Sequence, residues 1–136
     1  MSYDLAVWEG TRPESDAAAS VVYQELADRL ESGDTGQPVT EGIRAYVDAL
    51  LKRWPDITTD AGEESPWADG PLIGNAFGDA IYFSMVWSAA EEASEFAAQL
   101  AERHGLVCYD PQIEALRPPV GGPQPDTRRG WFRRTR

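Results

Sequence analysis

The clearest hydrophobic pattern in the chain lies in residues 79–112, where strand-type and helix-type spacings follow one another. Residues 80–86 are a short run of apolar and aromatic side chains of the kind enriched in strands. Apolar residues then recur at the spacing of a helix with one buried stripe, at Ala93, Phe96, Ala97 and Leu100. Residues 106–109 return to a strand-like composition. The segment is therefore predicted to form a strand, a helix and a second strand.

Local signals mark the ends of this predicted helix. Ser88 and Glu91 have the spacing of a capping box, in which a hydroxyl and a carboxylate satisfy backbone amides at a helix start. Gly105 stands where a helix end commonly needs a residue that tolerates positive φ. Asp110 and Pro111 then stop the second strand.

The N-terminal part of the chain predicts one strand and one helix. Residues 3–8 alternate large apolar with small or polar side chains and predict a strand that ends at Glu9-Gly10. Thr11 and Glu14 are spaced as a possible capping box for the helix that follows. This helix is expected to end by Ser32-Gly33, and its modest apolar stripe consists of Ala18, Val22, Leu26 and Leu30.

A second helix and a short strand complete the predicted elements. Thr40 can cap a helix that Pro55 ends, and its apolar residues repeat with few errors at Ile43, Tyr46, Val47, Leu50, Leu51 and Trp54. Residues 72–76 are a weaker strand candidate.

The element order is strand, helix, helix, strand, strand, helix, strand, or βααββαβ. Without one helix this becomes βαββαβ, the split-βαβ or ferredoxin-like arrangement. We therefore predict an α+β fold, with an antiparallel sheet of about four strands, helices on one face and one extra helix. Residues 1–116 are expected to form a single acidic domain. Residues 117–136 are rich in Pro, Gly and Arg and are expected to be flexible or loosely docked.

Length, cysteine content and charge exclude several classes of protein, among them disulfide-stapled domains, membrane-spanning proteins and nucleic-acid binders. A chain of 136 residues can bury a core as one domain, and Cys108, the only cysteine, excludes an internal disulfide. The sequence shows neither a membrane-spanning apolar run nor a secretory signal, so we expect a cytoplasmic protein. Residues 1–116 hold 6 basic and 22 acidic residues, a net charge of −16. A domain with this charge repels nucleic acid and anionic membranes and attracts basic partners. The alternative is that the charge only keeps the protein soluble.

Residues 56–70 are an acidic loop with one large aromatic residue, Trp67. Long loops in compact domains are often functional, and tryptophan beside acidic side chains suits recognition of a basic protein. We therefore predict a partner-binding surface formed by Trp54, Asp56, Asp60, Glu63, Glu64, Trp67 and Asp69. The alternative is that Trp54 is the last core residue of its helix and that Trp67 packs the loop onto the sheet.

Signals for catalysis, metals and cofactors are weak. His104 lies in the last turn of a predicted helix, where a surface role is expected, and Cys108 lies inside a strand, as a small buried hydrophobe would. Phosphate-binding glycine motifs are absent, and residues 56–67 fail the calcium-loop pattern. Glu63 and Asp69 are the best available pair for acid–base chemistry of the glycosidase type. We predict no catalytic residues, no metal and no cofactor.

The C-terminal segment, residues 128–134, mixes four arginines with Trp131 and Phe132. Such a composition suits nucleic acid or an acidic membrane surface. Beside so acidic a domain, however, the segment can equally fold back on its own chain or remain solvated. We expect neither nucleic acid nor membrane as a partner.

Several short motifs resemble a group of small uncharacterised bacterial proteins. They are residues 3–5, Tyr-Asp-Leu, then Ile81-Tyr82 leading to Trp87-Ser88, and residues 100–105, Leu-Ala-Glu-Arg-His-Gly. Proteins of this kind look like immunity proteins, which bind and block a bacterial toxin. The resemblance implies a non-enzymatic binder of a toxin, and it carries no catalytic residues. The acidic charge of residues 1–116 predicts that this toxin is basic, and we expect the protein to be a monomer or a homodimer. Two alternatives stay open: a small enzyme or ligand-binding domain with a cleft between the sheet and the 56–70 loop, and a module that self-associates through its sheet edge.

Overall fold

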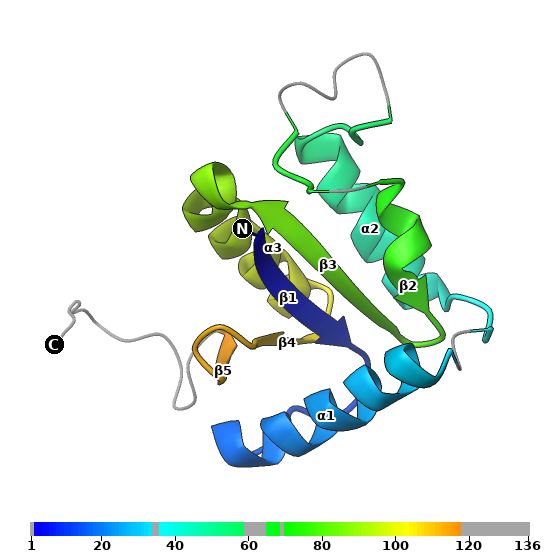
Figure 1. Cartoon of the computed structure of the whole chain (residues 1–136), viewed down its shortest axis with the longest axis vertical. Helices are drawn as coiled ribbons and strands as arrows, with labels where there is room; N and C mark the ends of the chain where they lie inside the picture. The colour runs from blue at the N-terminus through cyan, green and yellow to red at the C-terminus, as the bar shows by residue number, and fades with distance from the viewer. Residues whose placement is uncertain (1, 34–35, 59–64, 69, 118–136) are drawn as a thin grey trace, which may run out of the picture.

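The fold is organised around strand β1 (Ser2–Trp8), which lies in the middle of a five-stranded antiparallel sheet. The computed structural model describes residues 2–33, 36–58, 65–68 and 70–117. Within them, β1 pairs with β3 (Ala80–Val86) on one side and with β4 (Val107–Asp110) on the other. Strands β2 (Ala76–Phe77) and β5 (Ala115–Arg117) flank this core in the order β2-β3-β1-β4-β5 (Figure 1).

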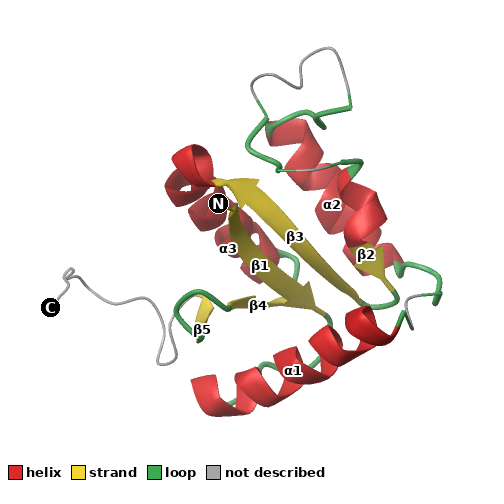
Figure 2. Cartoon of the chain, viewed as in Figure 1, coloured by secondary structure: helices red, strands yellow, loops and turns green. Residues whose placement is uncertain are grey.

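The two faces of the sheet bury different helices, because successive strand residues point to opposite sides. Leu5 and Val7 belong to the core that contains residues of α2 (Glu41–Arg53) and α3 (Ala90–Arg103). Ala6 and Trp8 belong to a second core with α1 (Asp16–Ser32). Figure 2 shows α3 behind the central strands and α1 crossing the lower end of the sheet. The chain is therefore α+β, with two helices on one face and one on the other.

Helix α2 begins and ends as the sequence predicts. The Oγ1 of Thr40 accepts a hydrogen bond of 3.3 Å from the Ile43 amide, and the helix ends at Arg53, two residues before Pro55. Helix α1 ends at Ser32, and the C-cap residue Gly33 has a φ of 81°, the left-handed conformation expected of a glycine at this position. Its N-cap, however, is Ser15 rather than Thr11, since the Ser15 side chain accepts from the Ala18 amide.

The predicted start of α3 is wrong, whereas its buried stripe is confirmed. Residues Trp87–Ala89 form a 3-10 turn, so Ser88 lies inside a helical turn instead of at the extended N-cap position. Helix α3 starts at Ala90 with no side-chain hydrogen bond to its N-cap. Ala93, Ala97 and Leu100 are buried, and Phe96 packs against them.

The apolar stripe predicted for α1 is wrong at two of its four positions. Ala18 and Leu30 are exposed, whereas Leu26 is buried as predicted. Ala19, which the prediction left out, is also buried. Val22 packs at the edge of this contact. The short side chains at the start of α1 give nearly equal apolar patterns on adjacent faces, and so the pattern did not fix which face is buried.

The sheet also differs from the prediction at both edges. Leu72–Asn75 form a 3-10 turn, and only Ala76–Phe77 pair with β3. The sheet has five strands rather than about four, because β5 pairs with β4 and includes Arg117. The Leu116 amide donates to the Asp16 carboxylate at 2.9 Å, which ties β5 to the start of α1. The remainder of the predicted tail, 118–136, lies outside the described residues.

In the part of the chain that the structure describes, no helix has the length and apolar character needed to cross a lipid bilayer.

Candidate functional site

Trp67, predicted to contact a partner, is instead a core residue. Its side chain is 1% exposed, its ring lies edge-on to Phe83, and its indole nitrogen donates to the Trp54 carbonyl at 3.0 Å. The backbone around it pairs with β3, since the Ala68 amide donates to the Ser84 carbonyl at 2.9 Å. This pairing aims the indole inward, so Trp67 is not accessible to a partner, and the structure agrees with the alternative in which Trp67 packs the loop onto the sheet.

Asp56 also has a structural role. The residue is 8% exposed, and its carboxylate accepts a hydrogen bond of 2.9 Å from the Leu72 amide. It thereby joins the two ends of the predicted loop. Four other predicted contact residues lie outside the described part of the chain: Asp60, Glu63, Glu64 and Asp69. The pair of Glu63 and Asp69 considered for acid–base chemistry lies outside it as well.

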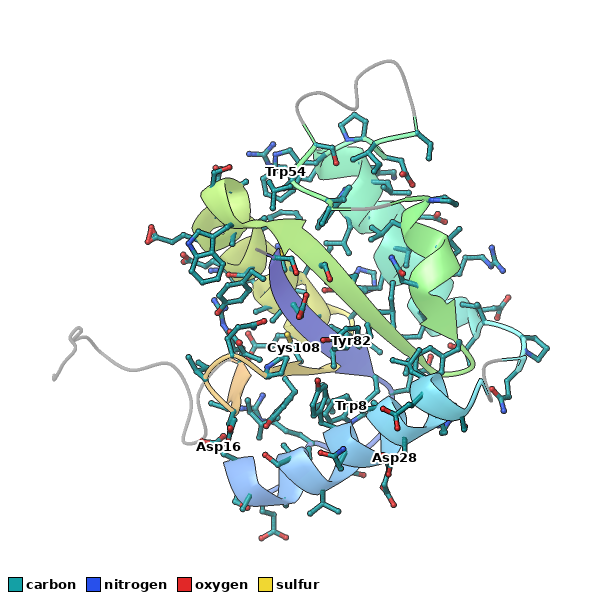
Figure 3. All side chains as sticks on the ribbon, in the orientation of Figure 1. Trp8, Asp16, Asp28, Trp54, Tyr82 and Cys108 are labelled. Atoms are coloured by element: carbon teal, nitrogen blue, oxygen red, sulfur yellow. The ribbon has the colours of Figure 1, made fainter. Side chains whose placement is uncertain are left out.

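Trp54 is half-buried and combines a packing role with an accessible face. Its ring lies edge-on to Trp67 at 6.0 Å and to Phe96 at 5.3 Å. The Arg53 guanidinium lies 4.2 Å from the centre of the same ring. Figure 3 shows Trp54 beyond the end of β3, between α2 and α3. Its packing against the core agrees with the alternative interpretation, although one side remains available.

The two residues considered for catalysis differ in their exposure to solvent. His104 is exposed at the C-terminal end of α3, and Cys108 is fully buried in β4. Burial raises the pKa of the Cys108 thiol to about 12, so that its nucleophilic thiolate form is disfavoured. Among the described residues no three histidine, cysteine or acidic side chains are grouped so as to hold a metal ion.

A groove of about 450 Å³ opens where the start of α3 faces the end of β5. We call it the α3 groove. It is lined by Tyr3, Trp87, Ala90, Glu91, Ser94, Glu95, Ile113 and Arg117.

Two walls of the α3 groove are exposed apolar side chains. Trp87 is 53% exposed and Ile113 is 61% exposed, which is unusual for residues of this size. The Trp87 ring lies 5.7 Å from the ring of Tyr3, so β1 supports it from one side. The result is an accessible aromatic surface held at a fixed place.

Asp110 lies below the groove and is fully buried. Its carboxylate accepts hydrogen bonds from the Tyr3 hydroxyl, from Arg117 Nη1 at 3.2 Å and from the Gln112 amide at 3.0 Å. Arg117 Nη1 also donates to Ser94 Oγ at 3.0 Å. Because Asp110 balances the charge of Arg117, the remaining charge of the groove comes from Glu91 and Glu95, both exposed on α3.

Gln112 fixes the turn that carries Ile113. Its side-chain nitrogen donates to the Asp4 carbonyl at 2.7 Å, and its side-chain oxygen accepts from the Asp4 amide at 2.7 Å. The same nitrogen donates to Asp110 at 2.6 Å. The amide thus pairs with β1 as a strand residue would, and this places Ile113 at the groove.

A second, shallower groove of about 240 Å³ runs along the other side of α3. Glu95 lines both grooves, so they form one continuous surface. The second groove contains Trp54 and Glu92, and Glu92 pairs with Arg53 at 3.3 Å. The surface as a whole presents glutamates between two tryptophans.

Sequence reasoning missed the main residues of this surface. Trp87 stands between a predicted strand and a predicted helix, where an aromatic residue is equally common in the core. Ile113 follows the last predicted strand, which Asp110 and Pro111 end, and the sequence predicted no element around it. The available signal was Trp87 followed by Glu91 and Glu95 at helical spacing, which puts all three near one face.

The groove predicts a specific dependence of stability on pH. Burial, followed by the hydrogen bond to Asp110, raises the pKa of Tyr3 to about 12, whereas the ordinary value is 10.0. The folded state holds this proton more tightly, so its contribution is present below pH 10 and is lost between about pH 10 and 12. In urea unfolding over this range, Tyr3→Phe is expected to lose less stability with rising pH than wild type. The buried Tyr46 and Tyr82 are present in both proteins, so they contribute equally to the pH dependence of each. If the free energy of unfolding fell equally with pH in wild type and Tyr3→Phe, the prediction for Tyr3 would be contradicted.

Comparison of the chain with protein-family models, curated proteins and solved structures finds no match. The resemblance to immunity proteins therefore remains a prediction from the sequence.

Proposed function

We propose that this chain is a non-enzymatic, cytoplasmic protein-binding module of the immunity type, which neutralises a basic bacterial toxin by covering it. The main support is that two strongly exposed apolar residues, Trp87 and Ile113, line the same groove as two glutamates without a basic partner in any described contact. A site that recognises a charged protein commonly has aromatic residues at its centre and, around them, side chains whose charge is opposite to that of the partner.

Each part of the surface has its own task in this proposal. Trp87 supplies rigid contact area, because its pairing with Tyr3 reduces the entropy lost on binding. Glu91 and Glu95 steer and orient a basic segment. A stable interface buries on the order of 1,600 Å², more than one groove offers, so the partner is expected to extend across Glu95 to Trp54.

The acidic residues of the 56–70 loop remain part of this proposal with a reduced role. Asp60, Glu63, Glu64 and Asp69 add negative charge to the capture of a basic partner. Trp67 and Asp56 are removed from the contact set, because both are buried. Reversing the charge of Glu63 and Glu64 is therefore expected to slow association more than it speeds dissociation.

The test of the proposal first asks whether the gene adjacent to that of this protein encodes a toxin that kills cells lacking this protein, and then measures binding to that gene product. A harmless product of that gene that does not bind the chain would contradict the proposal. Trp87→Ala combined with Glu95→Lys is expected to weaken the complex by at least about 30-fold, since losing an anchor of this kind costs about 2 kcal/mol or more. Calorimetry measures the affinity, and survival of cells expressing both proteins measures neutralisation.

A matched control also truncates one exposed apolar side chain and reverses one acidic charge, but does so on α1, away from the α3 groove. Val21 is 63% exposed on α1, and Asp28 is exposed on the same helix and points away from the sheet (Figure 3). Val21→Ala combined with Asp28→Lys should leave affinity within about 3-fold of wild type. Equal losses in both pairs would show that total charge, rather than the α3 surface, sets the affinity, and no loss in the first pair would reject the groove.

We further propose that the fold is of the split-βαβ, ferredoxin-like type. Strand β1 lies between β3 and β4, and β2 lies beyond β3, while α2 and α3 share one face. In this interpretation α1 is the extra helix and β5 is an added strand. Contacts between backbone amides across β1, β3 and β4 in an NMR spectrum test the arrangement.

A further inference from the structure

Exposed apolar residues gather at one end of the molecule. Six large hydrophobic residues are exposed in the described part of the chain, and three of them, Val86, Trp87 and Ile113, lie at or beside the α3 groove. Leaving this apolar area in water is unfavourable in the free protein. A segment able to cover it would lower the free energy even before an external partner arrives.

The chain itself contains a segment of suitable chemistry. Residues 128–134 read Arg-Arg-Gly-Trp-Phe-Arg-Arg, with two aromatic side chains between two pairs of arginines. Glu91 and Glu95 complement the arginines, while Trp87 offers an aromatic face to a guanidinium or another ring. Residues 1–116 otherwise carry a net charge of −16, so this segment is the main concentration of positive charge in the sequence.

The stretch of chain between the α3 groove and residues 128–134 is short enough to keep the two close together. The last described residue, Arg117, is itself part of the groove wall. Residues 118–127 separate it from the segment, and ten residues reach about 35 Å at most. A tether of this length gives an effective concentration on the order of millimolar, so even a weak contact is substantially formed.

We infer that in the free protein residues 128–134 occupy the α3 groove of their own chain, held by the arginines against Glu91 and Glu95 and by Trp131 against Trp87. The segment then acts as an internal competitor for the surface. An external basic partner must displace it, so the apparent affinity for that partner is lower than the intrinsic affinity of the groove. This inference goes beyond the proposed function, because it needs no external partner.

The test uses the full chain labelled with ¹⁵N. One variant replaces Arg128, Arg129, Arg133 and Arg134 by Gln and Trp131 by Ala. The indole resonance of Trp87 and the amides of Glu91 and Glu95 are expected to shift, whereas those of Val21 and Asp28 stay in place. Raising the salt to about 1 M, where the Debye length is about 3 Å, should weaken the docking and move the wild-type resonances toward those of the variant.

A reciprocal variant reports from the other side of the contact. Glu91→Gln with Glu95→Gln, in the otherwise native full chain, is expected to shift the indole resonance of Trp131. The matched control, Asp28→Asn with Glu31→Gln, removes two exposed acids from α1 and should not shift it. Both groove substitutions lie on the exposed side of α3, so the fold is retained.

The outcomes separate the possibilities. Reciprocal shifts that do not depend on protein concentration support docking within one chain. Shifts that grow with concentration would show that the segment fills the groove of a second copy, and this would overturn the inference. Unchanged Trp87 and Trp131 resonances would overturn it as well, whether or not the toxin-binding proposal holds.

Discussion

Trp67→Ala is expected to lower the free energy of unfolding by about 3–5 kcal/mol. Trp67 is among the largest fully buried side chains, and truncation leaves a cavity against Phe83 and Trp54. It also removes the donor to the Trp54 carbonyl. Urea unfolding followed by circular dichroism measures the change.

The control for this prediction is the other tryptophan of the same region. Trp87→Ala removes a side chain of equal size that is 53% exposed. Its expected cost is about 1 kcal/mol, from the lost pairing with Tyr3. If the two substitutions had equal effects on stability, Trp67 would not be the core residue that its burial indicates.

Asp110→Ala is expected to destabilise the protein by about 3 kcal/mol, because it breaks an ion pair whose carboxylate is fully buried and leaves the partly buried Arg117 and Tyr3 without this acceptor. Urea unfolding at neutral pH measures it. Asp28→Ala, on the exposed side of α1, should change stability by less than about 0.5 kcal/mol.

A second variant separates the charge from the hydrogen bonds. Replacing both partners, Asp110→Leu with Arg117→Leu, is expected to cost less than Asp110→Ala alone, since no unpaired buried charge remains. Greater destabilisation by the double variant would instead mean that Arg117 stabilises the fold mainly through Ser94 and its own packing.

Sequence reasoning placed the elements better than their ends. Periodicity located β1, α2, β3, α3 and β4, because each buries a regular face in a well-filled core. It failed at Leu72–Asn75 and at Trp87–Ala89, where the structure has 3-10 turns. Turns this short leave no repeating pattern, and their position depends on contacts with distant strands.

The candidate site was harder to predict, and for a different reason. Acidity and tryptophan directed attention to the 56–70 loop, but composition does not show which way an indole points. Trp67 turns inward because its backbone joins β3, a contact between segments that the sequence alone does not pair. Trp87 is exposed because the 3-10 turn carries it past the end of the sheet before α3 begins.

The central position of β1 constrains how the chain acquires its structure. Residues 2–8 pair with residues 80–86 and 107–110, so neither partner exists until most of the domain has been synthesised. Pairing across such sequence separations makes folding slow compared with that of helical bundles of similar size. During synthesis on the ribosome, the apolar side chains of Leu5, Val7 and Trp8 are therefore expected to stay exposed until β3 and β4 have been made. We expect this segment to be the part of the chain that most needs a chaperone during translation.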